Sequence, residues 1–157
     1  MLLSRVRVRN FRCIKDLSVD LEDMTVLIGE NNTGKTAFLD AVRICLSQLR
    51  PRSGRLFHEY DYHLPDDEAT PAGAEPIVIE LFFVEPQPES WNDDIVRELG
   101  NVAVLGEDDR YAVTFRLTSG FDRDTNDFSS EWAFLDAQGS PLTGPASTAA
   151  QLQCTGR

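Results

Sequence analysis

A glycine-rich loop of eight residues constrains the fold of this chain more than any other stretch. It reads Gly29-Glu30-Asn31-Asn32-Thr33-Gly34-Lys35-Thr36 and fits the phosphate-loop pattern G-x-x-x-x-G-K-[ST] at every fixed position. Such a loop aims successive backbone N–H groups inward, and the N-terminus of the following helix adds to the attraction for an anion. The sequence therefore predicts a site for a nucleoside triphosphate, with ATP and Mg²⁺ as the expected cofactors.

The individual loop residues have expected roles in that site. Lys35, the candidate catalytic residue, should reach the β- and γ-phosphates, and the Thr36 hydroxyl should be a ligand of Mg²⁺. Gly29 and Gly34 permit the tight winding of the backbone. The other expected nucleotide-binding residues are Asn31, Asn32, Thr33 and Ala37. The alternative is a chance match in a turn that precedes an ordinary helix.

The segments on either side of the loop supply the context that this motif requires. Residues 24–28 are an apolar run rich in β-branched side chains, which is typical of a parallel strand buried on both faces. From residue 35 to 49, polar residues recur at helical spacing on one narrow stripe, and Pro51 should end this helix. Cys45 falls on its apolar side and is expected to be a small core residue.

Alternation of apolar and polar residues predicts several further strands. Between residues 4 and 11, Arg5, Arg7 and Arg9 should lie on one face and the intervening valines on the other. We expect additional strands at residues 17–22, 77–84, 102–105, 111–117 and 131–136, and a short helix capped by Ser90 and closed by Gly100.

The order of these motifs resembles a known group of proteins. A strand, Asn10-Phe11-Arg12, another strand, the phosphate loop and Phe38-Leu39-Asp40-Ala41 resemble the N-terminal ATPase segment of the RecF, SMC and OLD (overcoming lysogenization defect) group of ABC-type ATPases. The Gly29-Glu30-Asn31-Asn32 variant looks most like the OLD endonucleases and their relatives in phage defence. The resemblance covers residues 1 to about 50 and continues weakly to about residue 85.

The resemblance implies a fold and one more site residue. The implied fold class is α/β, a P-loop NTPase with an ABC/RecF-like N-terminal lobe and an antiparallel β subdomain, incomplete as a domain. Arg12 becomes a candidate contact to ATP, the alternative being a surface arginine in a loop. We expect four regions: a strand-loop-helix core at residues 1–50, a loop-rich linker at 51–76, a β-rich subdomain at 77–142 and a flexible tail at 143–157.

The linker holds two histidines among carboxylates, within His58-Glu59-Tyr60-Asp61-Tyr62-His63. Their spacing matches no finger-type or helix-borne metal pattern, so a metal site is the less favoured interpretation. The favoured one places Asp61 or its neighbours in a loop near the nucleotide, although no glutamine occupies the place that ABC ATPases give to one.

Charge, cysteines and hydropathy restrict the classes of protein to which this chain can belong. The net charge is −11, but the first 55 residues hold ten Lys and Arg against six Asp and Glu. A local basic patch is therefore possible near the N-terminus, and a solvated strand edge is the alternative. The three cysteines form no C-x-x-C pair, which argues against a disulfide framework or zinc site. No run approaches a membrane span and no signal peptide is recognised, so a cytoplasmic protein is expected.

The residues needed for hydrolysis are not recognisable. No apolar run ends in Asp-Glu, no Leu-Ser-Gly-Gly-like signature is present, and Val84-Glu85 is the nearest approach to a strand-borne acid. The Toprim carboxylates of an OLD endonuclease are equally absent. We therefore expect the N-terminal part of a larger ATPase, inactive alone, which controls DNA processing or an antiphage nuclease. Its expected partners are further copies of the chain, in a homodimer or larger oligomer through the ATPase region, together with DNA and a nuclease domain or subunit, with no membrane.

Two alternatives to this function remain. One is a non-catalytic module that senses nucleotide and recruits a separate effector. The other is a small-molecule kinase, which is disfavoured because a basic strand and Asn-Phe-Arg precede the loop and no arginine-rich lid follows it.

Overall fold

Six strands form one antiparallel sheet in the computed structural model, which describes residues 1–49, 55–66, 68–106 and 108–142. The spatial order is β2-β1-β3-β5-β4, and β6 pairs with the same edge of β5 further along that strand. All the described strand pairs are antiparallel. The strands are β1 (Leu2–Phe11), β2 (Ile14–Asp20), β3 (Ile77–Val84), β4 (Val104–Leu105), β5 (Tyr111–Asp122) and β6 (Asp127–Leu135).

Strand alternation divides the sheet into an apolar face and a polar face. Val6 and Val8 of β1 are fully buried, and Ile79, Leu81 and Phe115 continue the same apolar layer across β3 and β5. These side chains share a face because the register pairs Val6 with Leu81 and Leu81 with Phe115. The predicted separation of arginines from valines in the first strand is confirmed.

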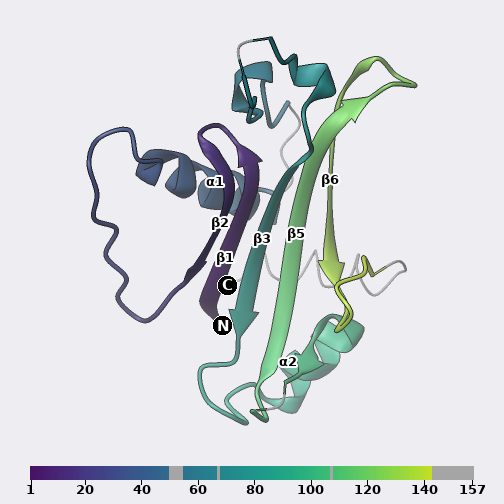
Figure 1. The fold of residues 1–157 in the computed structure, drawn as a ribbon. Helices are drawn as coiled ribbons and strands as arrows, with labels where there is room; N and C mark the ends of the chain where they lie inside the picture. Colours follow the sequence, from purple (N-terminus) through teal and green to yellow (C-terminus); the bar gives the residue numbers. More distant parts are fainter. Residues whose placement is uncertain (50–54, 67, 107, 143–157) are drawn as a thin grey trace.

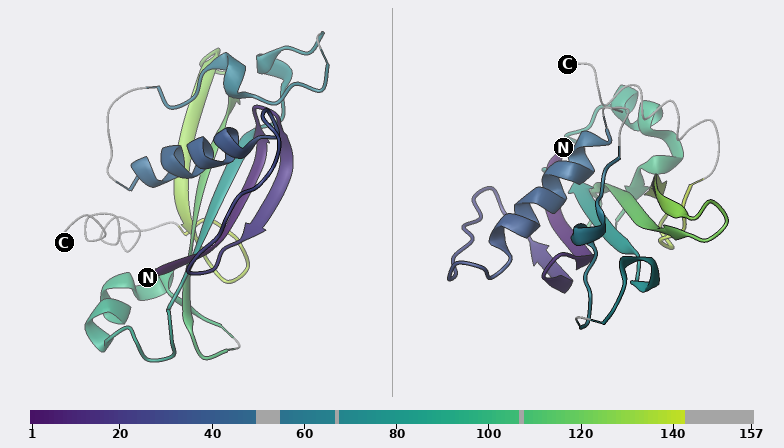
Figure 2. Two further views of the ribbon diagram at one scale, coloured as in Figure 1. Left: turned by 90° about the vertical axis from the view of Figure 1, so that its left-hand side faces the viewer. Right: turned by 90° about the horizontal axis from the view of Figure 1, so that it is seen from above.

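Helix α1 (Lys35–Ser47) covers the apolar face, as the two views in Figure 2 show. Phe38, Ala41 and Cys45 are buried on the side that faces β1 and β3. Cys45 Sγ donates a weak hydrogen bond to the carbonyl of Ile79, and burial raises the pKa of this thiol. Its expected role as a small core residue is confirmed.

The polar face of the sheet is held by ion pairs rather than by a cluster of free cations. Arg5 pairs with Asp20, Arg7 with Asp16, and Arg116 with Glu80, each across neighbouring strands. The charges of Arg5, Arg7 and Arg116 are therefore balanced locally, which argues against a basic patch formed by these three residues.

The strand expected at residues 24–28 does not form. This segment follows β2 without ladder pairing, as part of the long loop that leads into α1 (Figure 1), and Met24, Val26 and Ile28 are 83%, 70% and 91% exposed. The physical reason is that a strand needs neighbours for its N–H and C=O groups. The strands of the described residues pair with one another in a single sheet, and none of them pairs with this segment.

Several element boundaries also differ from expectation. Helix α2 (Asp93–Leu99) is capped by Asn92, whose side chain accepts a hydrogen bond from Ile95 N, and not by Ser90. Ser90 Oγ instead accepts a hydrogen bond from Gln87 N. Gly100 ends this helix as predicted. The strands expected at 17–22, 102–105, 111–117 and 131–136 are present with bounds shifted by up to five residues.

The expected division into four regions stays a prediction, although strands from residues 1–50 and from 77–142 share one sheet. The expected linker contains two 3-10 turns, η1 (Glu59–Asp61) and η2 (Pro71–Gly73). The expected tail at 143–157 lies outside the described residues. Within the described part of the chain, no helix has the length and apolar character that crossing a membrane requires.

Candidate functional site

The phosphate-loop sequence turns into α1 through two residues with left-handed backbone angles. Asn32 has a φ of 72°, and Gly34, the N-cap of α1, has a φ of 88°. Phe38 N then donates the first helical hydrogen bond to the Gly34 carbonyl, at 2.8 Å. The left-handed angle is what favours glycine at position 34, and an added Cβ would also lie 3.2 Å from Cys13 Sγ in the turn after β1.

The loop closes on itself around the Lys35 ammonium. Lys35 Nζ donates to the Gly29 carbonyl at 2.6 Å, to the Glu30 carbonyl, and to Thr33 Oγ1 at 3.3 Å. Thr33 Oγ1 in turn donates to the Glu30 carbonyl at 2.9 Å. Gly29 is needed here for space and not for its backbone angle, because a Cβ would lie only 2.9 Å from Thr33 Oγ1.

A cavity of about 360 Å³ opens at the start of α1. The first backbone N–H groups of a helix have no partner within the helix, so those at the start of α1 can bind an anion. Lys35 and Arg12 add two positive charges to the same cavity. Its lining residues are Arg12, Cys13, Asn31, Asn32, Gly34, Lys35, Thr36 and Ala37.

Seven of the nine expected binding residues therefore line one cavity, whereas Gly29 and Thr33 lie around the lysine ammonium. Whether these residues bind nucleotide stays a prediction. Sequence reasoning missed Cys13, which lines the cavity, and gave Asp40 no role beyond its place in the Phe38-Leu39-Asp40-Ala41 stretch.

Arg12 is fixed at this cavity by two carboxylates from distant parts of the chain. Its Nε donates to Asp61 Oδ1 at 2.8 Å, and its Nη1 donates to Asp40 Oδ2 at 2.6 Å. Asp40 also accepts a hydrogen bond from Arg43, and the hydrogen bond from Arg12 is the main cause that lowers the pKa of Asp40. Arg12 is thus part of a partly buried hydrogen-bond network and not an isolated surface arginine.

The two linker histidines have structural hydrogen bonds. His58 N donates to Asp61 Oδ2 at 2.9 Å, and His63 Nδ1 donates to the Arg12 carbonyl at 2.7 Å. No group of three or more His, Cys, Asp or Glu residues that could hold a metal ion occurs in the described ranges. The linker turn, with Asp61, does lie beside the cavity residue Arg12.

Glu85, the nearest approach to a strand-borne acid, is engaged elsewhere. Its carboxylate is fully buried and accepts hydrogen bonds from Trp91 N at 2.6 Å and Tyr111 N at 3.1 Å. The hydrogen bond from Trp91 is the main cause that lowers the pKa of Glu85. This carboxylate therefore fastens the chain after β3 and is not available to activate water.

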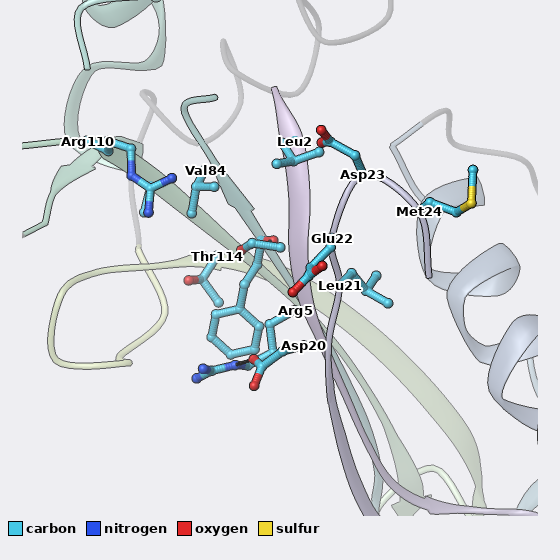
Figure 3. Close-up of a pocket in the computed structure, with 13 residues that line it drawn as sticks. Leu2, Arg5, Asp20, Leu21, Glu22, Asp23, Met24, Val84, Arg110 and Thr114 are labelled. Atoms are coloured by element: carbon cyan, nitrogen blue, oxygen red, sulfur yellow. Dashed lines mark hydrogen bonds and ion pairs between the residues drawn. The ribbon is translucent and has the colours of Figure 1, made fainter. Parts of the chain in front are cut away.

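A larger groove of about 760 Å³ lies at the opposite end of β1 (Figure 3). Arg5 there is paired with Asp20, and the carboxylates of Glu22 and Asp23 line the same groove. These acids repel a polyphosphate, so the cavity at the start of α1 is the better anion site despite its smaller volume.

Comparison with known proteins supports the resemblance seen in the sequence. The uncharacterized protein YbjD of Escherichia coli (strain K12) is 33% identical over 144 residues, which are 90% of this chain and 25% of that protein. The OLD nuclease of Thermus scotoductus is 36% identical over 61 residues, or 38% of this chain and 12% of the nuclease. The endonuclease GajA of Bacillus cereus is 35% identical over 66 residues, or 42% of this chain and 11% of that protein.

A solved structure shares the fold. It comes from a study of the structural biochemistry of ATP-driven dimerization and DNA-stimulated activation of SMC ATPases. The superposition has a TM-score of 0.53 at 16% identity and covers 98% of this chain and 78% of the other. The antiparallel sheet with its helix therefore resembles an SMC-type ATPase domain.

These comparisons confirm the resemblance to the N-terminal segment of the OLD group, and each sequence match spans a quarter or less of the relative's length. A family model described as "Protein of unknown function (DUF2813)" matches residues 1–153. Because this match spans nearly the whole sequence, the chain belongs to the DUF2813 family.

Proposed function

We propose that this chain is the ATP-binding module of an OLD- and RecF-like ATPase that controls DNA processing or an antiphage nuclease. The observation that carries the proposal is the cavity at the start of α1, where Lys35, Arg12 and helix N–H groups converge. An ammonium, a guanidinium and backbone N–H groups are all suited to bind phosphate oxygens, and here they come from the phosphate loop and from the turn after β1.

The residues present fit a triphosphate. In the structure the Lys35 ammonium is bound to carbonyl oxygens of its own loop, which are neutral acceptors. Phosphate oxygens carry negative charge and are stronger acceptors, so the ammonium is expected to exchange loop carbonyls for the β- and γ-phosphates. Mg²⁺ would supply charge neutralisation between the phosphates, and the Thr36 hydroxyl at the first helical turn is the candidate ligand.

Partners follow from the same proposal. The SMC ATPases of the structural comparison are described as dimerizing under ATP, and the sequence relatives include nucleases. We infer that this chain associates through its ATPase region with a second copy, and that DNA and a nuclease domain or subunit act in the complete system. Nucleotide state would then switch access to DNA.

One observation favours the alternative of a nucleotide sensor without catalysis. Glu85 is held by two backbone N–H groups, and Asp136, which follows the apolar end of β6, is held in the same way by Gln138 N and Ser140 N. The chain by itself is therefore expected to bind ATP and to release phosphate negligibly.

Titration of the full chain with ATP, with and without Mg²⁺, tests the proposal. Lys35→Ala removes a charge-assisted hydrogen bond worth about 1.5–3 kcal/mol, which corresponds to a tenfold to hundredfold loss of affinity. Thr36→Ala should abolish the gain in affinity from Mg²⁺ while leaving Mg²⁺-free binding in place. Lys15→Ala is the matched control, because Lys15 is exposed on β2 and does not line the cavity.

Equal ATP affinity of the parent and Lys35→Ala would refute nucleotide binding at this loop. Steady-state phosphate release that depends on Lys35 would instead refute the expectation that the chain alone is inactive.

A further inference from the structure

Residues 61–63 hold three separate groups of Arg12. Arg12 N donates to the Asp61 carbonyl at 2.7 Å, and Arg12 Nε donates to Asp61 Oδ1 at 2.8 Å. His63 Nδ1 lies 2.7 Å from the Arg12 carbonyl, and since a carbonyl only accepts, this ring nitrogen carries the proton. Backbone and side chain of the arginine are thus fixed by one short segment.

Arg12 needs such support because its backbone is strained. Its φ of 51° lies in the left-handed region, which is unfavourable for a residue with a side chain. Residues in this region keep their conformation only where surrounding contacts impose it. The contacts to Asp61 and His63 are the ones that do so here.

Asp61 is itself rigidly held. Its side chain is only 4% exposed, and its second oxygen accepts a hydrogen bond from His58 N at 2.9 Å. The carboxylate therefore presents one fixed oxygen to Arg12 Nε. Arg12 Nη1 is bound to Asp40, and no described residue accepts a hydrogen bond from Arg12 Nη2. Because Arg12 lines the cavity, Nη2 can donate to a ligand there.

We propose that Asp61 is a positioning residue that fixes Arg12 for contact with the triphosphate, with His63 as a second support. This inference rests on the proposed nucleotide-binding function. It also runs against simple electrostatics, because a carboxylate near an anion site should weaken anion binding through space. The sign of the effect of removing the Asp61 charge therefore separates positioning from a plain charge effect.

A double-mutant cycle on the full chain measures whether Asp61 affects ATP binding through Arg12. ATP affinity is compared for the parent, Arg12→Ala, Asp61→Asn and the combined variant. If Asp61 acts through Arg12, each single change lowers affinity about tenfold and the combined variant loses no more than Arg12→Ala alone. Asp16→Asn is the matched control, since it removes a carboxylate from the Arg7 pair on the polar face of the sheet and should leave affinity unchanged.

A second measurement needs no nucleotide. In the parent, the Nε–H group of Arg12 should give a resolved ¹H–¹⁵N resonance that exchanges slowly with water. In Asp61→Asn, this resonance should move to the chemical shift of exposed arginines and exchange as fast as theirs. His63→Asn, which keeps a donor near the Nδ1 position, should retain ATP affinity, whereas His63→Phe should lower it. Urea unfolding of each variant checks that the chain remains folded.

Tighter or unchanged ATP binding by a folded Asp61→Asn variant overturns the proposal, and so does an equal loss in the Arg12→Ala background. An unchanged Arg12 Nε–H resonance in Asp61→Asn overturns it as well. If the parent binds ATP no better than Lys35→Ala, the nucleotide-binding function itself fails, and the resonance then decides separately whether Asp61 holds Arg12.

Discussion

Substituting Gly34 by alanine tests the geometry of the loop directly. A left-handed backbone costs a residue with a Cβ about 1–2 kcal/mol, and alanine recovers about 0.4–1 kcal/mol because it restricts the unfolded chain. The net loss in the free energy of unfolding is therefore about 1 kcal/mol. The new Cβ would also lie 3.2 Å from Cys13 Sγ, but this side chain is exposed and can rotate away, so the contact adds little.

Urea unfolding followed by fluorescence of the two tryptophans, Trp91 and Trp132, measures this loss. A change of about 1 kcal/mol corresponds to roughly 2–4 °C in the melting temperature of a domain of this size. Gly139→Ala is the matched control, because Gly139 has a φ of 78° with no atom near its Cβ position. Alanine at position 139 has the same cost for a left-handed backbone, but it contacts no neighbouring side chain and lies far from the phosphate loop in the sequence.

The two alanine variants should differ in ATP affinity far more than in stability. Gly34→Ala shifts the amides at the start of α1 and should weaken ATP binding at least tenfold, whereas Gly139→Ala should leave it unchanged. If Gly34→Ala is as stable as the parent, the claim that Gly34 has a left-handed backbone conformation is refuted. If it is destabilised but binds ATP normally, the inference that this turn aims the N–H groups at phosphate is refuted.

Three further outcomes are expected. Because the hydrogen bond from Trp91 holds the pKa of Glu85 below its ordinary 4.5, Glu85 stabilises the fold above that value and the contribution is lost as the pH falls through the lower folded pKa. Chemical unfolding between pH 3 and 7 should therefore depend less on pH in Glu85→Gln than in the parent. Cys13 is exposed at the cavity whereas Cys45 is buried, so ATP should slow maleimide labelling at position 13, read by peptide mass spectrometry; equal rates with and without ATP would count against the site. Tyr62→Phe removes a buried hydroxyl hydrogen bond of 2.8 Å and should lower the free energy of unfolding by about 1 kcal/mol, and a neutral effect in urea would show that the bond contributes nothing.

Local patterns predicted the elements whose stability depends on one buried face. The alternation in β1 and the helical spacing after Lys35 each require only that one side meets a core, and both elements appear close to their expected bounds. The cap of α2 was displaced by two residues because Ser90 and Asn92 are both good capping residues, and sequence preference alone does not choose between them.

Features that depend on distant partners were beyond sequence reasoning. Residues 24–28 have strand-forming side chains, but a strand also needs neighbours, and nothing in the local pattern says whether they are present. Arg12 was identified only by resemblance, and its partners Asp40 and Asp61 lie 28 and 49 residues away in the chain. Their meeting at one cavity is a tertiary arrangement that spacing does not reveal.

The unpaired apolar segment before the phosphate loop has a consequence for how the protein behaves in concentrated solution. Val26 and Ile28 are exposed, and the backbone N–H and C=O groups of this segment have no strand partner. They can therefore pair with a strand of another molecule. Two copies meeting at these segments can form an intermolecular sheet and remove both apolar surfaces from water. Aggregation should therefore begin beside the cavity at the start of α1, and any polypeptide that covers this segment would keep the protein dispersed.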